Sequence, residues 1–321
     1  MSGAESAAGF GWLSSVLPTG VVLDPDRSST NHVAAAIDQA LRAYDAGVRQ
    51  LWIAQQFDHD AISLAGYVGA AVPGLGDGTF VVPINPRHPL IVASQAQTAQ
   101  AATGGNFALG LGLGAHAPEQ VAFGTAWPNT IGRLREHLQV LRAILDTGTV
   151  DFHGEEFTAA PQWPVTVAGG APLPVYVAAM GPKALRVTGE LADGTLPYLA
   201  GPRTLERFIV PTITAAASAA GRPAAKVIAA VPVLVTDDVD EGRARAAEAL
   251  EFYTTIPSYA RVIAREGVDS IIDLAAVGTA AQVGAQLRRY LDAGATDVVL
   301  SPLVRTGVAA LEPIWDVAAT L

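Results

Sequence analysis

Six consecutive residues after a short apolar run bring together two amides, two carboxylates and an imidazole. They are Gln55, Gln56, Phe57, Asp58, His59 and Asp60, and the apolar run before them spans 50–54. Amides can hold a polar heterocycle, whereas an imidazole beside a carboxylate can move protons near neutral pH. We therefore take Gln55 and Gln56 as candidate cofactor-binding residues, and His59 with Asp58 as candidate catalytic residues. In the alternative interpretation, Asp60 caps a helix and its neighbours are simply solvated.

A second segment places glycine at alternate positions. Gly110, Gly112 and Gly114 close a predicted strand at 107–113. Glycine weakens a strand, so such positions usually mark the close approach of a ligand or of another backbone. A flat ring lying against Gly112 and Gly114 would explain the pattern, and so would small residues filling the inside of a closed sheet. The spacing differs from the dinucleotide-binding fingerprint, because the third glycine comes one residue early. His116 follows directly and is a further candidate proton donor.

A third segment has the features of an anion-binding helix start. A predicted strand at 175–179 runs into small residues and a helix-starting proline, and the candidate cofactor-binding residues here are Ala178, Ala179, Met180, Gly181, Pro182 and Lys183. The free N–H groups at such a helix start favour phosphate. Lys183 and Arg186 occupy the first turn, where acidic residues are usual, and a docked anion would account for them. An ordinary turn is the alternative. The same two alternatives hold for Arg87 and His88, before the proline-started helix predicted at 89–103.

Composition excludes other kinds of chemistry. The chain has no cysteine, so disulfides and thiolate catalysis are excluded, and its six histidines show no paired metal-ligand spacing, so no metal site is predicted. The net charge of −10, without a basic tract, argues against nucleic acid or a membrane as partner. We find no signal peptide and no apolar run of about 18 residues, and we therefore expect a cytoplasmic protein.

Apolar runs and helical patterns alternate from end to end of the chain. The predicted strands are 9–17, 50–54, 80–83, 107–113, 175–179, 194–197, 227–235 and 297–301. The predicted helices are 31–46, 62–72, 89–103 and 133–146, with others that start near Pro182, Pro202, Val239 and Ala280. The segment 149–174, with a small hairpin at 150–157, and the segment 253–277 are predicted insertions.

Eight strands, each followed by a helix, predict an α/β fold, namely a (β/α)8 TIM barrel with insertions before strand five and before the last repeat. A doubly wound open sheet would leave about half of the chain to a second domain, and no linker is visible. We therefore predict one domain over 1–321, with 1–8 as a disordered lead-in. Active sites of such barrels lie where the strands end, so the three segments should meet at one mouth.

Several short motifs, in this order and spacing, resemble the luciferase-like monooxygenase superfamily, in particular its branch of coenzyme F420 (deazaflavin)-dependent oxidoreductases. The resemblance covers about 33–302. The motifs are AG at 46–47, LW at 51–52, TFVVP at 79–83, RHP at 87–89, TGGNF at 103–107, RLRE at 133–136, GPKAL at 181–185, GELADG at 189–194 and AGATD at 293–297.

The resemblance implies a TIM barrel that is often dimeric, so we expect a homodimer. It also implies a non-proline cis peptide among Phe80, Val81 and Val82 that presses on the cofactor ring, which makes Val81 and Val82 cofactor-binding residues. The cofactor phosphate would lie on the backbone around 179–181, and the end of strand four would contact the ring or ribityl chain. One departure from the family is the long apolar stretch 18–24 after the first predicted strand. Another is the Gln55–Gln56 pair, which replaces an aspartate–histidine pairing unless Asp58 and His59 take its place.

Three functions remain open at this point. The resemblance implies hydride transfer between F420 and a small organic substrate with a C=C, C=N or C=O bond. An FMN-dependent monooxygenase that uses reduced flavin and oxygen is the first alternative. A non-catalytic barrel that only binds a flavin is the second. Tight binding of F420 with FMN ignored would favour the first function, and turnover of any acceptor would exclude the last.

Overall fold

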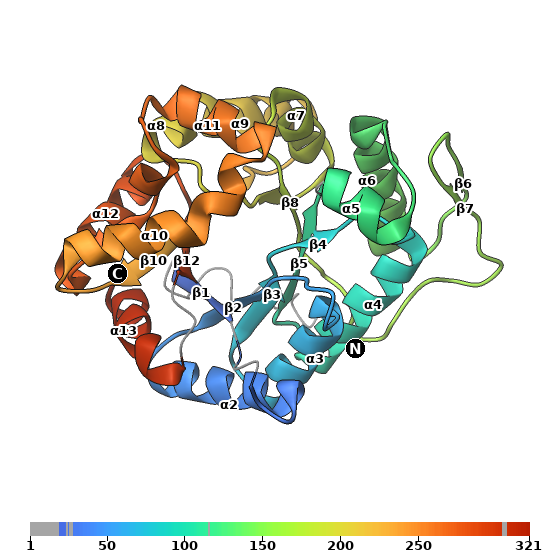
Figure 1. The fold of residues 1–321 in the computed structure, drawn as a ribbon. Coiled ribbons are helices and arrows are strands. Elements are labelled where there is room, and N and C mark those ends of the chain that lie inside the picture. Colours follow the sequence, from blue (N-terminus) through green and yellow to red (C-terminus); the bar gives the residue numbers. More distant parts are fainter. Residues whose placement is uncertain (1–18, 24, 26–27, 115, 304–306) are drawn as a thin grey trace, which may run out of the picture.

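The fold is a closed (β/α)8 barrel, seen along its axis in Figure 1. The structure is a computed structural model that describes residues 19–23, 25, 28–114, 116–303 and 307–321. Parallel pairing runs in chain order around the barrel and returns from the last strand to the first, where Thr19 pairs with Val298. The barrel strands are β1 (Thr19–Leu23), β2 (Gln50–Ile53), β3 (Gly76–Thr79), β5 (Phe107–Gly112), β8 (Val175–Ala178), β9 (Gly194–Thr195), β10 (Lys226–Val235) and β12 (Asp297–Pro302). The predicted fold class is confirmed.

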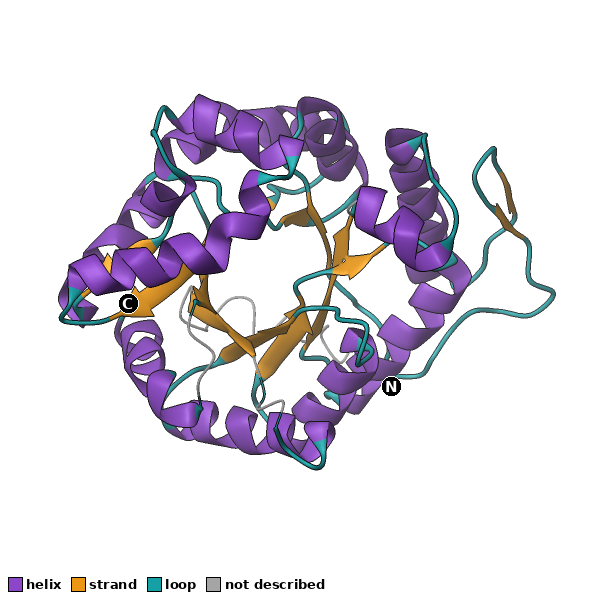
Figure 2. Cartoon of the chain, viewed as in Figure 1, coloured by secondary structure: helices purple, strands orange, loops and turns teal. Residues whose placement is uncertain are grey.

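Helices form the outer ring around the strands (Figure 2). They are α2 (His32–Asp45), α3 (Ala61–Ala71), α4 (Pro89–Ala102), α5 (His116–Phe123), α6 (Thr130–Thr147), α7 (Pro182–Leu191), α8 (Pro202–Thr204), α9 (Val210–Ala219), α10 (Val239–Thr254), α11 (Pro257–Glu266), α12 (Ala280–Asp292) and α13 (Glu312–Thr320), with the short turns η1 (Leu205–Ile209), η2 (Ile271–Leu274) and η3 (Val308–Ala310). Local caps explain several starts. The side chain of Asn31 accepts the N–H of Ala34 at α2, and that of Asp60 accepts the N–H of Ser63 at α3.

Both predicted insertions are present. A small antiparallel hairpin, β6 (Phe152–His153) with β7 (Thr158–Ala159), lies between α6 and β8. Helix α11 and strand β11 (Ala276–Gly278) lie before the last repeat, and β11 pairs with the C-terminal part of β10. Strand β4 (Val82–Pro83) continues the edge beside β5. Among the helices of the described ranges, none has the length and apolarity needed to cross a membrane.

Two strands differ from the sequence prediction. The first barrel strand is Thr19–Leu23, whereas the predicted strand 9–17 and the lead-in 1–8 lie outside the described residues. The third strand is Gly76–Thr79, which precedes the predicted 80–83. The sequence Gly-Asp-Gly-Thr has little β-propensity, but a side chain at Gly78 would collide with the ring of Trp52, so packing inside the barrel selects glycine there.

The barrel interior is a packed core. Its buried residues are Trp52, Ala108, Tyr176, Leu196, Ile228, Ala230 and Val299. Side chains of a strand point inward at every second residue, so the next inward position toward the strand end lies one layer closer to the C-terminal mouth. Five partly buried side chains pack on this core, namely Val22, Phe80, Val81, Ala178 and Tyr198. We call these five residues the mouth layer.

Two buried titratable side chains lie outside the barrel interior. His137 of α6 is fully buried, and neither of its ring nitrogens has a hydrogen-bond partner among the described residues. Burial, followed by the nearby charge of Arg133, lowers the pKa of His137 to about 3. Asp77 of β3 is also buried, and burial raises its pKa well above the usual value despite an N–H of Gly69. His137 is therefore neutral at neutral pH, and burial favours the neutral, protonated form of Asp77.

Candidate active site

The mouth layer gives the C-terminal end of the barrel an apolar floor. The peptide between Phe80 and Val81, just after β3, is cis, as the resemblance implied. The ring of Phe80 meets that of Trp52 edge-on, with centroids 6.2 Å apart. Ala178 is the next inward position after the buried Tyr176 of β8, so both strand ends contribute to one surface. Such a surface suits one face of a flat ring system.

The loop after β2 is held together by the side-chain amide of Gln55. The Oε1 atom of Gln55 accepts the N–H of Ala61 and a hydrogen bond from Arg87, both at 3.0 Å, while its Nε2 donates to the carbonyls of Gln56 and His59. Arg87 also pairs with Asp60, at 2.6 Å. In this structure Gln55 and Arg87 therefore tie the loop, and Arg87 acts as part of a rigid turn. Whether Gln55 and Gln56 touch a cofactor stays a prediction.

Asp60 shows how firmly this loop is held. Burial raises its pKa, but the hydrogen bonds from Ser63 and Arg87 outweigh that effect, so the net pKa is lowered. The capping alternative raised for Asp60 is thus what the structure shows. Phe57 at the loop tip remains 82% exposed, with its ring 5.9 Å from that of Phe123.

The His59 ring, one of the candidate proton-transfer groups, has oxygen atoms at both of its nitrogens. Nδ1 lies 2.8 Å from Oδ1 of Asp58, and Nε2 lies 3.0 Å from the carbonyl oxygen of Ala54. A carbonyl and a carboxylate can only accept, so the hydrogen bond at either ring nitrogen is one that the ring donates. The ring of His32 lies beside that of His59, with centroids 4.9 Å apart and the planes tilted by 30°. Asp58 and His59 are thus brought together as a hydrogen-bonded pair.

The alternate glycines are surrounded by protein on the side where a Cβ would lie. A Cβ at Gly110 would lie 1.9 Å from the carbonyl oxygen of Thr79, and one at Gly112 would lie 2.6 Å from the side chain of Val81. Gly114 has a φ of +79° and packs against the carboxylate of Glu119. Close approach of neighbouring chain therefore accounts for these glycines, and contact of Gly112 and Gly114 with a cofactor stays a prediction.

The end of β8 leads into an open helix start. Helix α7 begins after Gly181 without a side-chain cap and has a proline in its first turn. A Cβ built on Gly181 would meet nothing within 4 Å, and Gly181, Pro182 and Lys183 are exposed. Ala179, by contrast, is buried, with its backbone bound to β8 and Thr195. The exposed, uncapped N-terminus of α7 fits an anion such as phosphate.

Two further candidate residues, His116 and Val82, lie in α5 and in β4. His116 is the first residue of α5, close in sequence to the end of β5. Val82 is buried in β4, beside Leu111 of β5, so its side chain belongs to the core between the barrel and the helices. Within the described ranges, no group of three or more histidine, aspartate or glutamate side chains could hold a metal ion.

Sequence reasoning missed a cluster of tyrosines at the mouth. The ring of Tyr198, after β9, lies 5.3 Å from that of Tyr253 in α10 and 6.4 Å from that of Tyr259 in α11. Tyr253 and Tyr259 are 5.1 Å apart. Nothing local in the sequence links Tyr198 to Tyr253 and Tyr259, which lie more than 50 positions further on.

The residues present fit a cofactor that joins a flat ring to a phosphate. The mouth layer offers the apolar surface for the ring, and the open space at Gly181 leaves the helix start accessible to the phosphate. Fold and mouth together define a class of protein, the (β/α)8-barrel oxidoreductases that work with a flavin or a deazaflavin. Within that class the chain belongs to the luciferase-like monooxygenase family, whose family model matches residues 13–297.

Individual relatives fall into more than one functional group. A 5,10-methylenetetrahydromethanopterin reductase of Methanopyrus kandleri is 28% identical over 273 residues, which cover 78% of this chain and 75% of the relative. The structure of the coenzyme F420-dependent tetrahydromethanopterin reductase from Methanopyrus kandleri has a TM-score of 0.80 at 21% identity, covering 95% of this chain and 99% of that one. The EDTA monooxygenase of Chelativorans sp. BNC1 has a TM-score of 0.77 at 18% identity, covering 95% and 93%. The two structural likenesses show the fold alone.

Proposed function

We propose that this protein transfers a hydride between coenzyme F420 and a small organic substrate with a C=C, C=N or C=O bond. The observation that carries the proposal is an apolar mouth layer combined with a helix start that is open to an anion. In a cofactor that joins a flat ring to a phosphate, the ring matches the apolar mouth layer and the phosphate matches the helix start. F420 is preferred over FMN because a sequence relative from Mycobacterium tuberculosis, 27% identical over 173 residues, is named as a coenzyme F420-dependent oxidoreductase.

The chain's own residues would then bind, orient and shield the cofactor. When bound, F420 supplies a carbon that donates or accepts the hydride. The residues proposed to hold it are Gln55, Gln56, Val81, Val82, Gly112, Gly114, Ala178, Ala179, Met180, Gly181, Pro182 and Lys183. Val82 would contribute only its backbone, because its side chain is buried in the core outside the barrel. The mouth layer would support one face of the ring, which leaves the other face to the substrate. The backbone before α7, aided by the charge of Lys183, would bind the phosphate.

A proton must accompany the hydride, and the proposed groups are His59, His116 and Asp58. Nδ1 of His59 lies 2.8 Å from Oδ1 of Asp58. To donate a proton to a substrate, the His59 ring would have to break its contact with Asp58 or with Ala54. We therefore expect Asp58 to orient His59 and to retain the proton until the substrate is bound.

Cofactor titrations test the proposal. Binding of F420 with FMN ignored supports it, whereas binding of FMN alone overturns the cofactor assignment. Turnover of any acceptor with reduced cofactor excludes a non-catalytic barrel. For the proton, His59→Gln should lower turnover at least ten-fold without changing cofactor affinity. His153→Gln is the matched control, because His153 forms a similar pair with Asp151, at 3.0 Å, on the exposed hairpin. Equal losses in both variants would contradict the assignment of His59.

An FMN-dependent monooxygenase is the second candidate. The family is described as luciferase-like monooxygenases, and the EDTA monooxygenase shares the fold. The same apolar floor and helix start would accept FMN, which also joins a flat ring to a phosphate. Oxygen consumption with reduced FMN and a substrate, absent with reduced F420, would favour this candidate.

We further propose that the protein is a homodimer that associates through α3 and α4. Neither helix contains an acidic or basic residue, and a groove of about 480 Å³ lies between them. It is lined by Ile62, Gln95 and Tyr67, which is 60% exposed, and otherwise by small residues. Two chains of net charge −10 repel each other, so an uncharged face is where two copies can meet without opposing like charges. Light scattering should give the mass of a dimer, and Ala70→Glu should give a monomer. A monomeric wild type would refute the proposal.

A further inference from the structure

Three aromatic side chains form a row in the loops that follow β2 and β5. Phe57 lies in the loop after β2, Phe123 ends α5, and Trp127 lies in the connection from α5 to α6. The ring centroids of Phe57 and Phe123 are 5.9 Å apart, and those of Phe123 and Trp127 are 6.1 Å apart. We call these three residues the aromatic ridge. Phe57 is 82% exposed and Phe123 is 40% exposed, so the ridge presents ring surface to a ligand.

Hydrogen bonds place the aromatic ridge beside the mouth layer. Strand β3 lies between β2 and β5, and β4 pairs with β5, so the chain that follows β4 runs between the two loops of the ridge. In that chain, Arg87 pairs with Asp60 of the loop after β2, and Asn85 donates to the carboxylate of Glu119 in α5, at 3.3 Å. The contact between Phe57 and the end of α5 therefore closes across the strand ends that carry the cis peptide of the mouth layer.

The ring of Phe123 faces the strand ends. Glu119 and Phe123 are four residues apart in α5 and so lie on the same face of this helix. Glu119 is buried and packs against Gly114, just after β5, which shows that this face is directed toward the barrel. Val121, on the opposite face, is 87% exposed. Phe123 thus keeps an accessible ring surface on the side of the candidate active site.

The aromatic ridge is firmly held and small. Arg133 donates from Nε to Asn85 at 2.5 Å, and its guanidinium carbon lies 5.8 Å from the centroid of Trp127. A surface that is already ordered loses little entropy when a ligand binds. The accessible area of the three side chains is roughly 300 Å². This is well below the approximately 800 Å² per partner of a stable protein interface, but it is enough for one ring-sized group.

We propose that the aromatic ridge is a subsite for a flat apolar group of the substrate, such as a phenyl ring. The substrate is then a molecule that carries this group a few carbon atoms away from its reacting double bond. Neighbouring strands lie about 5 Å apart, so one molecule can cover both the ridge and the mouth layer. The inference rests on the proposed function, because it assumes that the reaction takes place over the mouth layer.

The test compares two ketones, 4-phenyl-2-butanone and 2-butanone, which differ only in the phenyl group. In NMR titrations the wild type should bind the phenyl ketone about ten-fold more tightly, as expected when one face of a phenyl ring is buried. Phe57→Ala and Phe123→Ala should each reduce this preference to about three-fold, and the double variant should abolish it. The affinity for 2-butanone, the cofactor affinity and the melting temperature should stay unchanged.

Trp163→Ala is the matched control. Trp163 is also an exposed aromatic residue, at 72%, but it lies between β7 and β8. Nearby, the N–H of Val165 donates to the carbonyl of Gly148 at the C-terminal end of α6, which is the end of the helix remote from the mouth. This variant should keep the ten-fold preference. A loss as large as that in Phe57→Ala would overturn the subsite.

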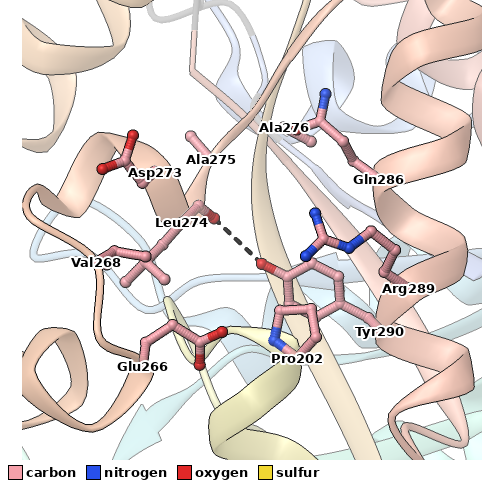
Figure 3. Close-up of a pocket in the computed structure, with 10 residues that line it drawn as sticks. All are labelled: Pro202, Glu266, Val268, Asp273, Leu274, Ala275, Ala276, Gln286, Arg289 and Tyr290. Carbon is pink, nitrogen blue, oxygen red and sulfur yellow. Dashed lines mark hydrogen bonds between the residues drawn. The ribbon is translucent and has the colours of Figure 1, made fainter.

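A second control concerns the cavity of about 180 Å³ between α8, η2 and α12 (Figure 3). The charged side chains of Glu266, Asp273 and Arg289 line it, unlike the aromatic ridge. Tyr290 also lines this cavity, and its hydroxyl donates to the carbonyl of Leu274 at 3.3 Å. Tyr290→Phe should leave both affinities unchanged. A reduced preference for the phenyl ketone in this variant would place the phenyl group there and overturn the proposal.

The two proposals fail in different ways. Lack of F420 binding refutes the proposed function and is measured without a ketone. The ketone titrations use whichever cofactor binds, and otherwise the cofactor-free protein. Equal affinity of the wild type for the two ketones, no measurable binding of the phenyl ketone, or a preference that survives in the double variant would overturn the subsite. A dimer mass that falls in the double variant, with the preference unchanged, would instead assign the ridge to contact between two copies.

Discussion

Gly181→Asp is the substitution that most directly tests the anion site at α7. Gly181 precedes Pro182 with φ −98° and ψ 153°, an extended backbone that aspartate adopts readily, and a Cβ there meets nothing within 4 Å. The new carboxylate would lie close to the position proposed for the cofactor phosphate. At about 6 Å and an effective dielectric constant of about 20, two unit charges repel by roughly 3 kcal/mol. Solvent exposure and salt reduce this to about 1–2 kcal/mol, so cofactor affinity should fall about 5–30-fold.

The same substitution should stabilise the cofactor-free protein. Helix α7 has no side-chain cap, and an aspartate at this position accepts N–H groups of the first turn and interacts favourably with the helix dipole. We expect a gain of roughly 0.3–1 kcal/mol in the free energy of unfolding. Lower affinity together with higher stability cannot result from a damaged fold.

Gly181→Asn is the control, since it has the same shape and capping ability but no charge. Cofactor titration at low and at high salt, together with urea unfolding of the cofactor-free protein, measures both effects. The difference between the aspartate and asparagine variants should shrink at high salt. If both variants bind the cofactor with equal affinity at low salt, the phosphate does not lie at this helix start and the reasoning is refuted.

Three further predictions concern stability. The pKa of His137 is lowered from 6.5 to about 3, so its contribution to the free energy of unfolding is fully present above pH 6.5 and is lost as the pH falls toward 3, by roughly 5 kcal/mol in all. In urea unfolding between pH 7 and pH 4, His137→Leu should therefore lose less free energy of unfolding than the wild type. Parallel pH curves for the two proteins would contradict this. The pKa of Asp77 is raised, so its contribution to the free energy of unfolding is most favourable below pH 3.8 and declines as the pH rises. The free energy of unfolding of Asp77→Asn should therefore increase relative to that of the wild type from pH 4 to pH 7. A constant difference between the two proteins would refute the assignment. Arg87→Met should cost about 1–3 kcal/mol and speed proteolysis in 55–60, because it removes the ties to Asp60 and Gln55, and equal cleavage rates would speak against it.

Several predictions are outside what the structure and the comparisons test. The assignment of the whole chain to one domain, the cytoplasmic location and the roles of individual site residues stay predictions. The family and the barrel are confirmed, whereas F420 as the cofactor and hydride transfer as the reaction belong to the proposal.

Much of the fold could be predicted because its signals are local. Helix α2 begins after Asn31 and α4 begins at Pro89, as their capping residue and proline indicate. Strands β10 and β12 are continuous apolar runs of the kind that parallel sheets bury on both faces. Strand β3 could not be predicted in this way, because its glycine at position 78 is required by the ring of Trp52 from another strand.

The sequence by itself determined where polar and small residues follow strands, and hence that a mouth with an anion site at Gly181 should exist. Only the tertiary structure decided which chain segments fill the space beside Gly110 and Gly112, since a glycine pattern does not reveal what approaches it. It also brought Tyr253 and Tyr259, from an insertion, onto Tyr198. The physical reason is that strand and helix patterns depend on neighbours a few residues away, whereas the chemistry of a barrel mouth depends on side chains that meet only when the sheet closes.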